Sequence, residues 1–190
     1  EIKEGGISFI RVTDNGCGIN TDDISKAFER HATSKISNIN DLNTLSTLGF
    51  RGEALASISA VSELECITKS KASFTGIHYS VSQGTGGDIK EIGCPDGTTF
   101  VVRNLFYNVP ARKKFLKTAA TEASYITDLV EKLALSHPGI AFNYIVNGQS
   151  RLATKGSGNL LDVIYNVYGR DITGNVTELS IDTDIITAHG

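Results

Sequence analysis

The stretch DNGCGI at residues 14–19 decides how the rest of this chain is organised. An apolar run precedes it and a run with helical character follows it from near Asn20, so Asp14 stands where a strand ends and a turn begins. Gly16 and Gly18 let the backbone turn sharply and allow a flat ligand to approach the main chain. An ionised carboxylate only accepts hydrogen bonds, so the natural partner of Asp14 is a donor such as the exocyclic amine of a base. An ordinary turn between two elements is the alternative interpretation.

A second stretch, LGFRGEAL at residues 48–55, is a glycine-flanked loop that runs into a helix. The predicted helix has apolar residues at intervals of three to four, which are Ala54, Leu55, Ile58 and Val61. Exposed amide groups at a helix N-terminus favour phosphate, and Arg51 adds a positive charge. The alternative is a helix that merely follows a flexible loop.

Together these stretches resemble motifs of the superfamily that contains DNA gyrase, heat-shock chaperones, histidine kinases and MutL. The heptad RHATSKI at residues 30–36, the loop at residues 49–55 and the stretch FYNVPARKKFL at residues 106–116 resemble the MutL family of mismatch-repair ATPases in particular. The resemblance covers the whole chain and is strongest at residues 10–116, and several long motifs in order are more specific than any single match.

The resemblance implies a nucleotide site of unusual design, since the sequence has neither a G-x-x-x-x-G-K-[ST] nor a G-x-G-x-x-G motif. Asp14 would bind the adenine amine, Gly16 and Gly18 would shape the pocket wall, and Thr98 would hold a water against the base. The other implied ATP contacts are Ala32, Thr33, Ser34 and Lys35 on a lid, and Leu48, Gly49, Phe50, Arg51, Gly52, Glu53, Ala54 and Leu55 around the triphosphate.

Three of these residues also have ordinary interpretations. Thr98 fits the first position of a strand, Lys35 fits a solvated lysine, and Glu53 fits an acid that stabilises the dipole of a helix N-terminus. We do not interpret Glu53 as the catalytic base.

The catalytic residues are expected to lie outside this chain. In the family, the glutamate that activates water and the asparagine that binds Mg²⁺ lie on a helix that would precede Glu1, and a phosphate-sensing lysine would follow Gly190. We therefore expect a fragment cut at both ends, with no catalytic residue and no metal ligand of its own. The parent would be an ATPase that uses ATP and Mg²⁺, and this fragment alone would be inactive.

The resemblance also implies partners. ATP binding would order residues 32–50, produce a homodimer and couple a mismatch-recognition protein of the MutS type to later repair factors. Arg112, Lys113 and Lys114, with Lys117 nearby, could contact DNA weakly, although a solvated helix face is the default interpretation of such a cluster. The rival interpretations are a gyrase-like or chaperone-like ATPase, and a non-catalytic module that binds DNA or protein without nucleotide.

Composition limits the remaining classes. The chain has 190 residues, 40% of them hydrophobic, and a net charge of −3, which argues against a general polyanion binder. Its three cysteines are widely spaced and form no C-x-x-C, so we expect reduced thiols in a cytoplasmic protein rather than a disulfide or zinc site. No apolar run approaches the length of a membrane span.

The pattern of elements predicts an α+β fold, implied by resemblance to be a two-layer α/β sandwich followed by the start of a second, ribosomal S5-like transducer domain. The first predicted elements are a buried strand at residues 7–13 and a helix capped by Asn20. Strands follow at residues 64–68, 77–81, 88–92 and 98–105, and then a helix from Thr121 to about residue 137. The last predicted elements are a hairpin around Asn147 and Gly148, a helix at 160–167 closed by Gly169, and strands at 176–181 and 185–188. Residues 155–159 are the predicted linker, which divides an ATP-binding domain at 1–155 from the start of the transducer domain at 156–190.

Overall fold

The computed structural model describes residues 1–29, 52–177, 179–183 and 185–189. It divides the chain into two compact units, Glu1–Ala123 and Ser124–Gly190. The helix α3 (Ala119–Ser136) begins in the first unit and ends in the second. Every expectation for residues 30–51 lies outside the described residues.

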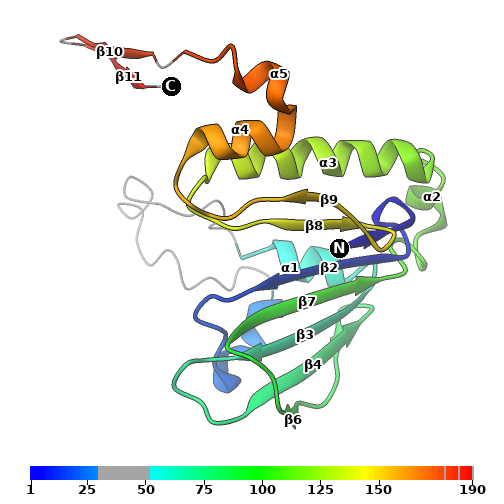
Figure 1. The fold of residues 1–190 in the computed structure, drawn as a ribbon. Coiled ribbons are helices and arrows are strands. Elements are labelled where there is room, and N and C mark those ends of the chain that lie inside the picture. Colours follow the sequence, from blue (N-terminus) through cyan, green and yellow to red (C-terminus); the bar gives the residue numbers. More distant parts are fainter. Residues whose placement is uncertain (30–51, 178, 184, 190) are drawn as a thin grey trace. The chain divides into compact units, whose positions relative to one another are not determined.

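The first unit is built on an antiparallel sheet whose strands follow the order β5-β4-β3-β7-β2-β1, with β6 paired to β4 (Figure 1). The strands are β1 (Ile2–Lys3), β2 (Phe9–Asp14), β3 (Glu63–Lys69), β4 (Gly76–Ser82), β5 (Thr85–Gly86), β6 (Lys90–Ile92) and β7 (Gly97–Arg103). A 3₁₀ turn, η1 (Glu4–Gly6), joins β1 to β2 in a hairpin. The α+β prediction is confirmed.

One face of this sheet carries the core of the first unit. Burial alternates along β3, with Leu64, Cys66 and Thr68 buried, as expected for a strand that has one face inside. The core cluster comprises Ile24, Cys66, Ile77, Tyr79 and Val81, against which Ile19, Phe28 and Phe100 pack. Phe28 meets Tyr79 edge to face at 5.3 Å between ring centroids, which is the favoured geometry for aromatic pairs.

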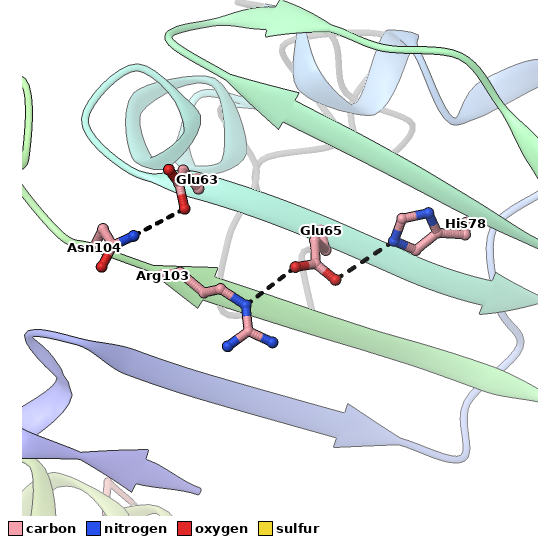
Figure 2. A network of polar contacts seen from close by, with 5 residues as sticks. All are labelled: Glu63, Glu65, His78, Arg103 and Asn104. Carbon is pink, nitrogen blue, oxygen red and sulfur yellow. Dashed lines mark hydrogen bonds and ion pairs between the residues drawn. The ribbon is translucent and has the colours of Figure 1, made fainter.

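The other face of the sheet carries polar contacts between neighbouring strands (Figure 2). The carboxylate of Glu65 lies between Arg103 and His78, at 3.1 Å from Arg103 Nε and 3.5 Å from His78 Nε2. Asn104 donates a hydrogen bond of 2.9 Å to Glu63. The ion pair of Glu65 with Arg103 links β3 to β7, and the contact of Glu65 with His78 links β3 to β4.

Short helical segments cover the core face. They are η2 (Thr21–Asp23), η3 (Lys26–Phe28) and α1 (Ala54–Ser59), which lie behind the sheet in Figure 1. The prediction of a regular helix capped by Asn20 is wrong in the described part of that stretch, because the two segments are 3₁₀ turns and the Asn20 side chain makes no capping hydrogen bond. The side chains of Asn, Thr, Asp and Ser form local hydrogen bonds that compete with a regular helix. The packing of Ile24, which is fully buried, therefore decides the path of the chain here.

Two further expectations are corrected. The helix α1 ends at Ser59, before Val61, and its buried residues are Ala56 and Ser59, whereas Ala54 is exposed. The strand β2 does lie between β7 and β1, yet none of its residues is buried and Val12 is 59% exposed. The described core lies over β3 and β4, so the interior position of β2 in the sheet does not bury its side chains.

The second unit contains the predicted hairpin and helix. Its elements are β8 (Asn143–Val146), β9 (Gln149–Ala153), α4 (Leu160–Tyr168), α5 (Arg170–Thr173), β10 (Ser180–Asp182) and β11 (Thr187–His189). Asn147 and Gly148 both have positive φ, as the predicted hairpin turn requires. Gly169 ends α4 as predicted, and β10 pairs with β11 in a shorter hairpin than expected.

The predicted linker is tied to the loop that follows α3. A Cβ on Gly156 would lie 2.6 Å from the amide nitrogen of Ala141, and the amide of Gly158 donates to the carbonyl of Pro138 at 3.0 Å. This part of the chain is therefore packed within the second unit. The domain boundary near Gly156 stays a prediction.

Candidate nucleotide-binding site

The site begins where the ends of three strands meet. In the register of the sheet, Asp14 at the end of β2 pairs with Thr98 at the start of β7, and Thr98 pairs on its other side with Thr68 of β3. Side chains directly opposite one another in antiparallel strands lie on the same face, with Cβ atoms about 4.5–5.5 Å apart. The sheet thus brings together two predicted site residues, Asp14 and Thr98, that are far apart in the sequence.

The carboxylate of Asp14 is oriented by the turn that follows it. The amide of Gly16 donates a hydrogen bond of 2.8 Å to Asp14 Oδ1, which closes a turn over residues 14–16. One carboxylate oxygen is therefore engaged with the backbone, and the residue as a whole stays exposed. The arrangement holds an acceptor at the end of β2 for a donor on a ligand.

Two glycines allow this turn to pack against the neighbouring strands. Gly18 has φ of +72°, and a Cβ there would lie 2.1 Å from the carbonyl oxygen of Lys69. Gly97 has φ of +113°, and its Cβ would lie 2.1 Å from the carbonyl oxygen of Asp14. Both contacts are with backbone atoms, so a side chain at either position would displace the wall of the site.

Thr68 is a residue of the site that the sequence analysis missed. Its hydroxyl is fully buried, accepts from the amide of Ile19 at 2.9 Å and donates to the carbonyl of Gly97 at 3.0 Å. It also lies 3.1 Å from the hydroxyl of Thr98. A signal was present in the sequence, because Thr68 is a polar residue at the inward position of an alternating strand.

The thiol of Cys66, on the same face of the sheet, has a raised pKa. Burial raises the pKa of Cys66 to about 12, and the negative charge of Asp14 adds to the shift. Cys66 therefore stays a neutral, apolar side chain at physiological pH and has no nucleophilic character. The influence of Asp14 on Cys66 agrees with their placement on the same face of the sheet.

The remaining predicted nucleotide contacts are described only in part. Gly52, with φ of +63°, precedes α1, and Glu53 stands at its N-terminus without a side-chain capping hydrogen bond. Ala54 is exposed and Leu55 is half-buried. Ala32, Thr33, Ser34, Lys35, Leu48, Gly49, Phe50 and Arg51 lie outside the described residues.

The predicted basic cluster lies on α2 (Pro110–Lys113) and just after it. Arg112, Lys113 and Lys114 are exposed, and the neighbouring Phe115 is 82% exposed. The geometry agrees both with a solvated helix face and with a surface for phosphate groups.

The described residues form neither a metal-binding cluster nor a membrane-spanning helix. They contain no group of three or more His, Cys, Asp or Glu side chains arranged to hold a metal ion. They also contain no helix with the length and apolar character that crossing a membrane requires.

Comparison with known proteins gives close relatives. No protein-family model matches the chain. It is 56% identical over all 190 residues to the DNA mismatch repair protein MutL of Agathobacter rectalis and 48% identical over the same length to that of Clostridium acetobutylicum. The chain spans 29% and 30% of the length of these two relatives.

Solved structures give the same result. The Aquifex aeolicus MutL ATPase domain complexed with ADP matches with a TM-score of 0.70 and 30% identity, over 85% of this chain and 57% of that one. The N-terminal domain of a DNA repair protein matches with a TM-score of 0.77 and 26% identity, over 95% of this chain and 53% of that one. Both likenesses support the predicted two-layer sandwich. The sequence identity to MutL proteins favours MutL over the gyrase-like and chaperone-like alternatives. On sequence identity along its whole length and on its fold, the chain belongs to the MutL family of DNA mismatch-repair proteins.

Proposed function

We propose that this chain binds the adenine base of ATP in a MutL-type mismatch-repair ATPase. The observation that carries the proposal is the pairing of Asp14 with Thr98 at the ends of β2 and β7, with the carboxylate held by the amide of Gly16 at 2.8 Å. A similar solved chain is described as a MutL ATPase domain complexed with ADP.

The chemistry of the site favours adenine. The free oxygen of the Asp14 carboxylate is an acceptor, and adenine presents an amine donor at the position where guanine presents a carbonyl acceptor. Guanine would place two acceptors against each other, with no proton between them. Gly16 and Gly18 form a wall without side chains, which lets the flat base lie close to the backbone.

The phosphates would extend from this pocket toward residues 48–55, with residues 32–35 on the lid. Most of these residues lie outside the described part of the chain, and the assignment depends on the resemblance of their motifs. The described residues alone do not fit a magnesium site, since they bring together no metal-binding cluster. We therefore assign no step to Mg²⁺ among the described residues. We expect residues 1–190 alone to release no phosphate above background.

The wider proposal concerns the full-length protein. ATP binding would favour a homodimer that links a MutS-type mismatch-recognition protein to later repair factors in the cytoplasm, with Arg112, Lys113 and Lys114 giving weak contact with DNA. Membership of the MutL family supports this setting, and a non-catalytic module without nucleotide is the remaining alternative.

The experiment is calorimetric titration of the full-length protein with a non-hydrolysable ATP analogue. In the variant Asp14→Asn, the side-chain oxygen that accepts from Gly16 is retained and the other oxygen becomes an NH₂ donor. The amine of adenine then faces a donor, and loss of a hydrogen bond to a charged group weakens binding by about 1.5–3 kcal/mol. Asp88→Asn changes an exposed carboxylate elsewhere and serves as the matched control.

Unchanged affinity in a folded Asp14→Asn protein would remove Asp14 from the site. Absence of nucleotide binding by the unmodified full-length protein would favour the non-catalytic module instead.

A further inference from the structure

We propose that Thr68 is a positioning residue that fixes the hydroxyl of Thr98 as a hydrogen-bond acceptor toward the nucleotide and so contributes to the choice of adenine over guanine. The inference rests on the proposed function, because it concerns the same base pocket. It adds a residue that has no direct contact with the base and acts through the direction of one proton.

The direction of that proton follows from the donors and acceptors around Thr68. A hydroxyl has one proton to donate and can accept from two donors. The amide of Ile19 is a donor only, so Thr68 accepts from it at 2.9 Å. The carbonyl of Gly97 is an acceptor only, so Thr68 gives it its proton at 3.0 Å. In the remaining contact, 3.1 Å long, Thr68 must accept and Thr98 must donate.

Burial makes this arrangement stable. Thr68 is 0% exposed and Thr98 is 7% exposed, so water does not compete strongly for the three contacts. A buried donor or acceptor without a partner is destabilising, which disfavours any rotation of the Thr68 hydroxyl away from Gly97. Ile19 and Gly97 belong to the turn and the strand that flank Asp14, so the same hydroxyl ties both sides of the site together.

The consequence for the ligand is a base edge that meets only acceptors. The proton of Thr98 points at Thr68, so the lone pairs of Thr98 are what remains for the amine of a base or for an intervening water. Asp14, the register partner of Thr98, also offers an acceptor. Adenine has an amine for this edge, and guanine has a carbonyl that finds no donor there.

Removal of the Thr68 hydroxyl would release the proton of Thr98. In Thr68→Val, a change of nearly equal shape, the Thr98 hydroxyl loses its buried acceptor and is free to turn its proton toward the ligand. It then offers a donor to the carbonyl of guanine. The ratio of the GTP dissociation constant to the ATP dissociation constant should therefore fall by about three- to tenfold, which corresponds to one ordinary hydrogen bond.

The test is titration of the full-length protein with non-hydrolysable analogues of ATP and GTP. Thr68→Ser keeps the hydroxyl and should restore the ratio to within about twofold of the unmodified protein, which a merely structural role of the side chain would not predict. Thr99→Val is the matched control, because Thr99 also makes a hydroxyl contact, 3.0 Å from Thr13, on the opposite face of β7. It should leave the ratio unchanged.

The ratio is measured within one preparation, so a partial loss of folded protein cancels. If Thr68→Val does not fold, Thr68→Cys carries the same comparison, since a thiol is a much weaker hydrogen-bond partner than a hydroxyl. An unchanged ratio in a folded variant that lacks the hydroxyl would overturn the inference. Failure of the unmodified protein to prefer ATP would instead overturn the proposed function, so the two failures are distinguishable.

Discussion

Replacement of Gly18 by alanine tests the close packing that shapes the site. Gly18 has φ of +72°, and the added Cβ would lie 2.1 Å from the carbonyl oxygen of Lys69 and 2.8 Å from the amide nitrogen of Ser70. Both atoms belong to the backbone at the end of β3, so relief of the clash requires movement of the turn or of the strand. Movement of the turn also displaces Asp14.

The expected loss of stability has two parts. A left-handed conformation costs an L-residue about 1–2 kcal/mol. Overpacking adds about 1–3 kcal/mol when the neighbours cannot move easily. Gly84 separates the two parts, because its φ is +73° and nothing lies within 4 Å of the position of its Cβ. Gly84→Ala should lose only the first part.

The assay compares thermal unfolding and ATP affinity of the two variants in the full-length protein. A difference of about 2 kcal/mol corresponds to a difference of about 4–8 °C in melting temperature for a domain of this size. Gly18→Ala should also bind the ATP analogue more weakly, whereas Gly84→Ala should bind it normally. Equal melting temperatures for the two variants would show that the backbone contact at Gly18 is absent, and the reasoning would be refuted.

Two further predictions concern titration and charge. The pKa of Cys66 is raised to about 12 in the folded protein. In the unfolded chain a cysteine has a pKa of about 8.5, so between these two values only the unfolded state loses the proton. The free energy of unfolding should therefore fall as pH rises, by up to about 1.4 kcal/mol per pH unit. Urea denaturation at several alkaline pH values should show a shallower dependence in Cys66→Ala, and identical slopes would contradict the prediction. If Arg112, Lys113 and Lys114 contact DNA, their joint replacement by alanine should reduce the slope of log affinity against log salt by about 0.9 for each phosphate that the protein no longer neutralises. An unchanged slope in a filter-binding or anisotropy titration would identify them as a solvated face.

The sequence by itself determined the elements whose signals are local. The strand expected at residues 64–68 and the turn at Asn147 and Gly148 were predictable because strand propensity and turn chemistry act over a few residues. The end of α4 at Gly169 has the same kind of cause. The motifs around Asp14 also indicated the family, because several of them occur in order along one chain.

Only the tertiary structure decided which residues share the site and which are buried. Asp14, Thr68 and Thr98 meet because three strands that are separated in sequence pair in one particular register, and a shift by one residue would turn Thr68 and Thr98 to the opposite face. The 3₁₀ turns near Ile24 and the exposure of Val12 likewise depend on which distant parts of the chain pack against these segments. Local sequence sets the side-chain period of a strand, but distant parts of the chain set its register and determine what packs against it. The register brings Thr68 beside Thr98, and we propose that this contact fixes the direction of the Thr98 proton and so selects the base.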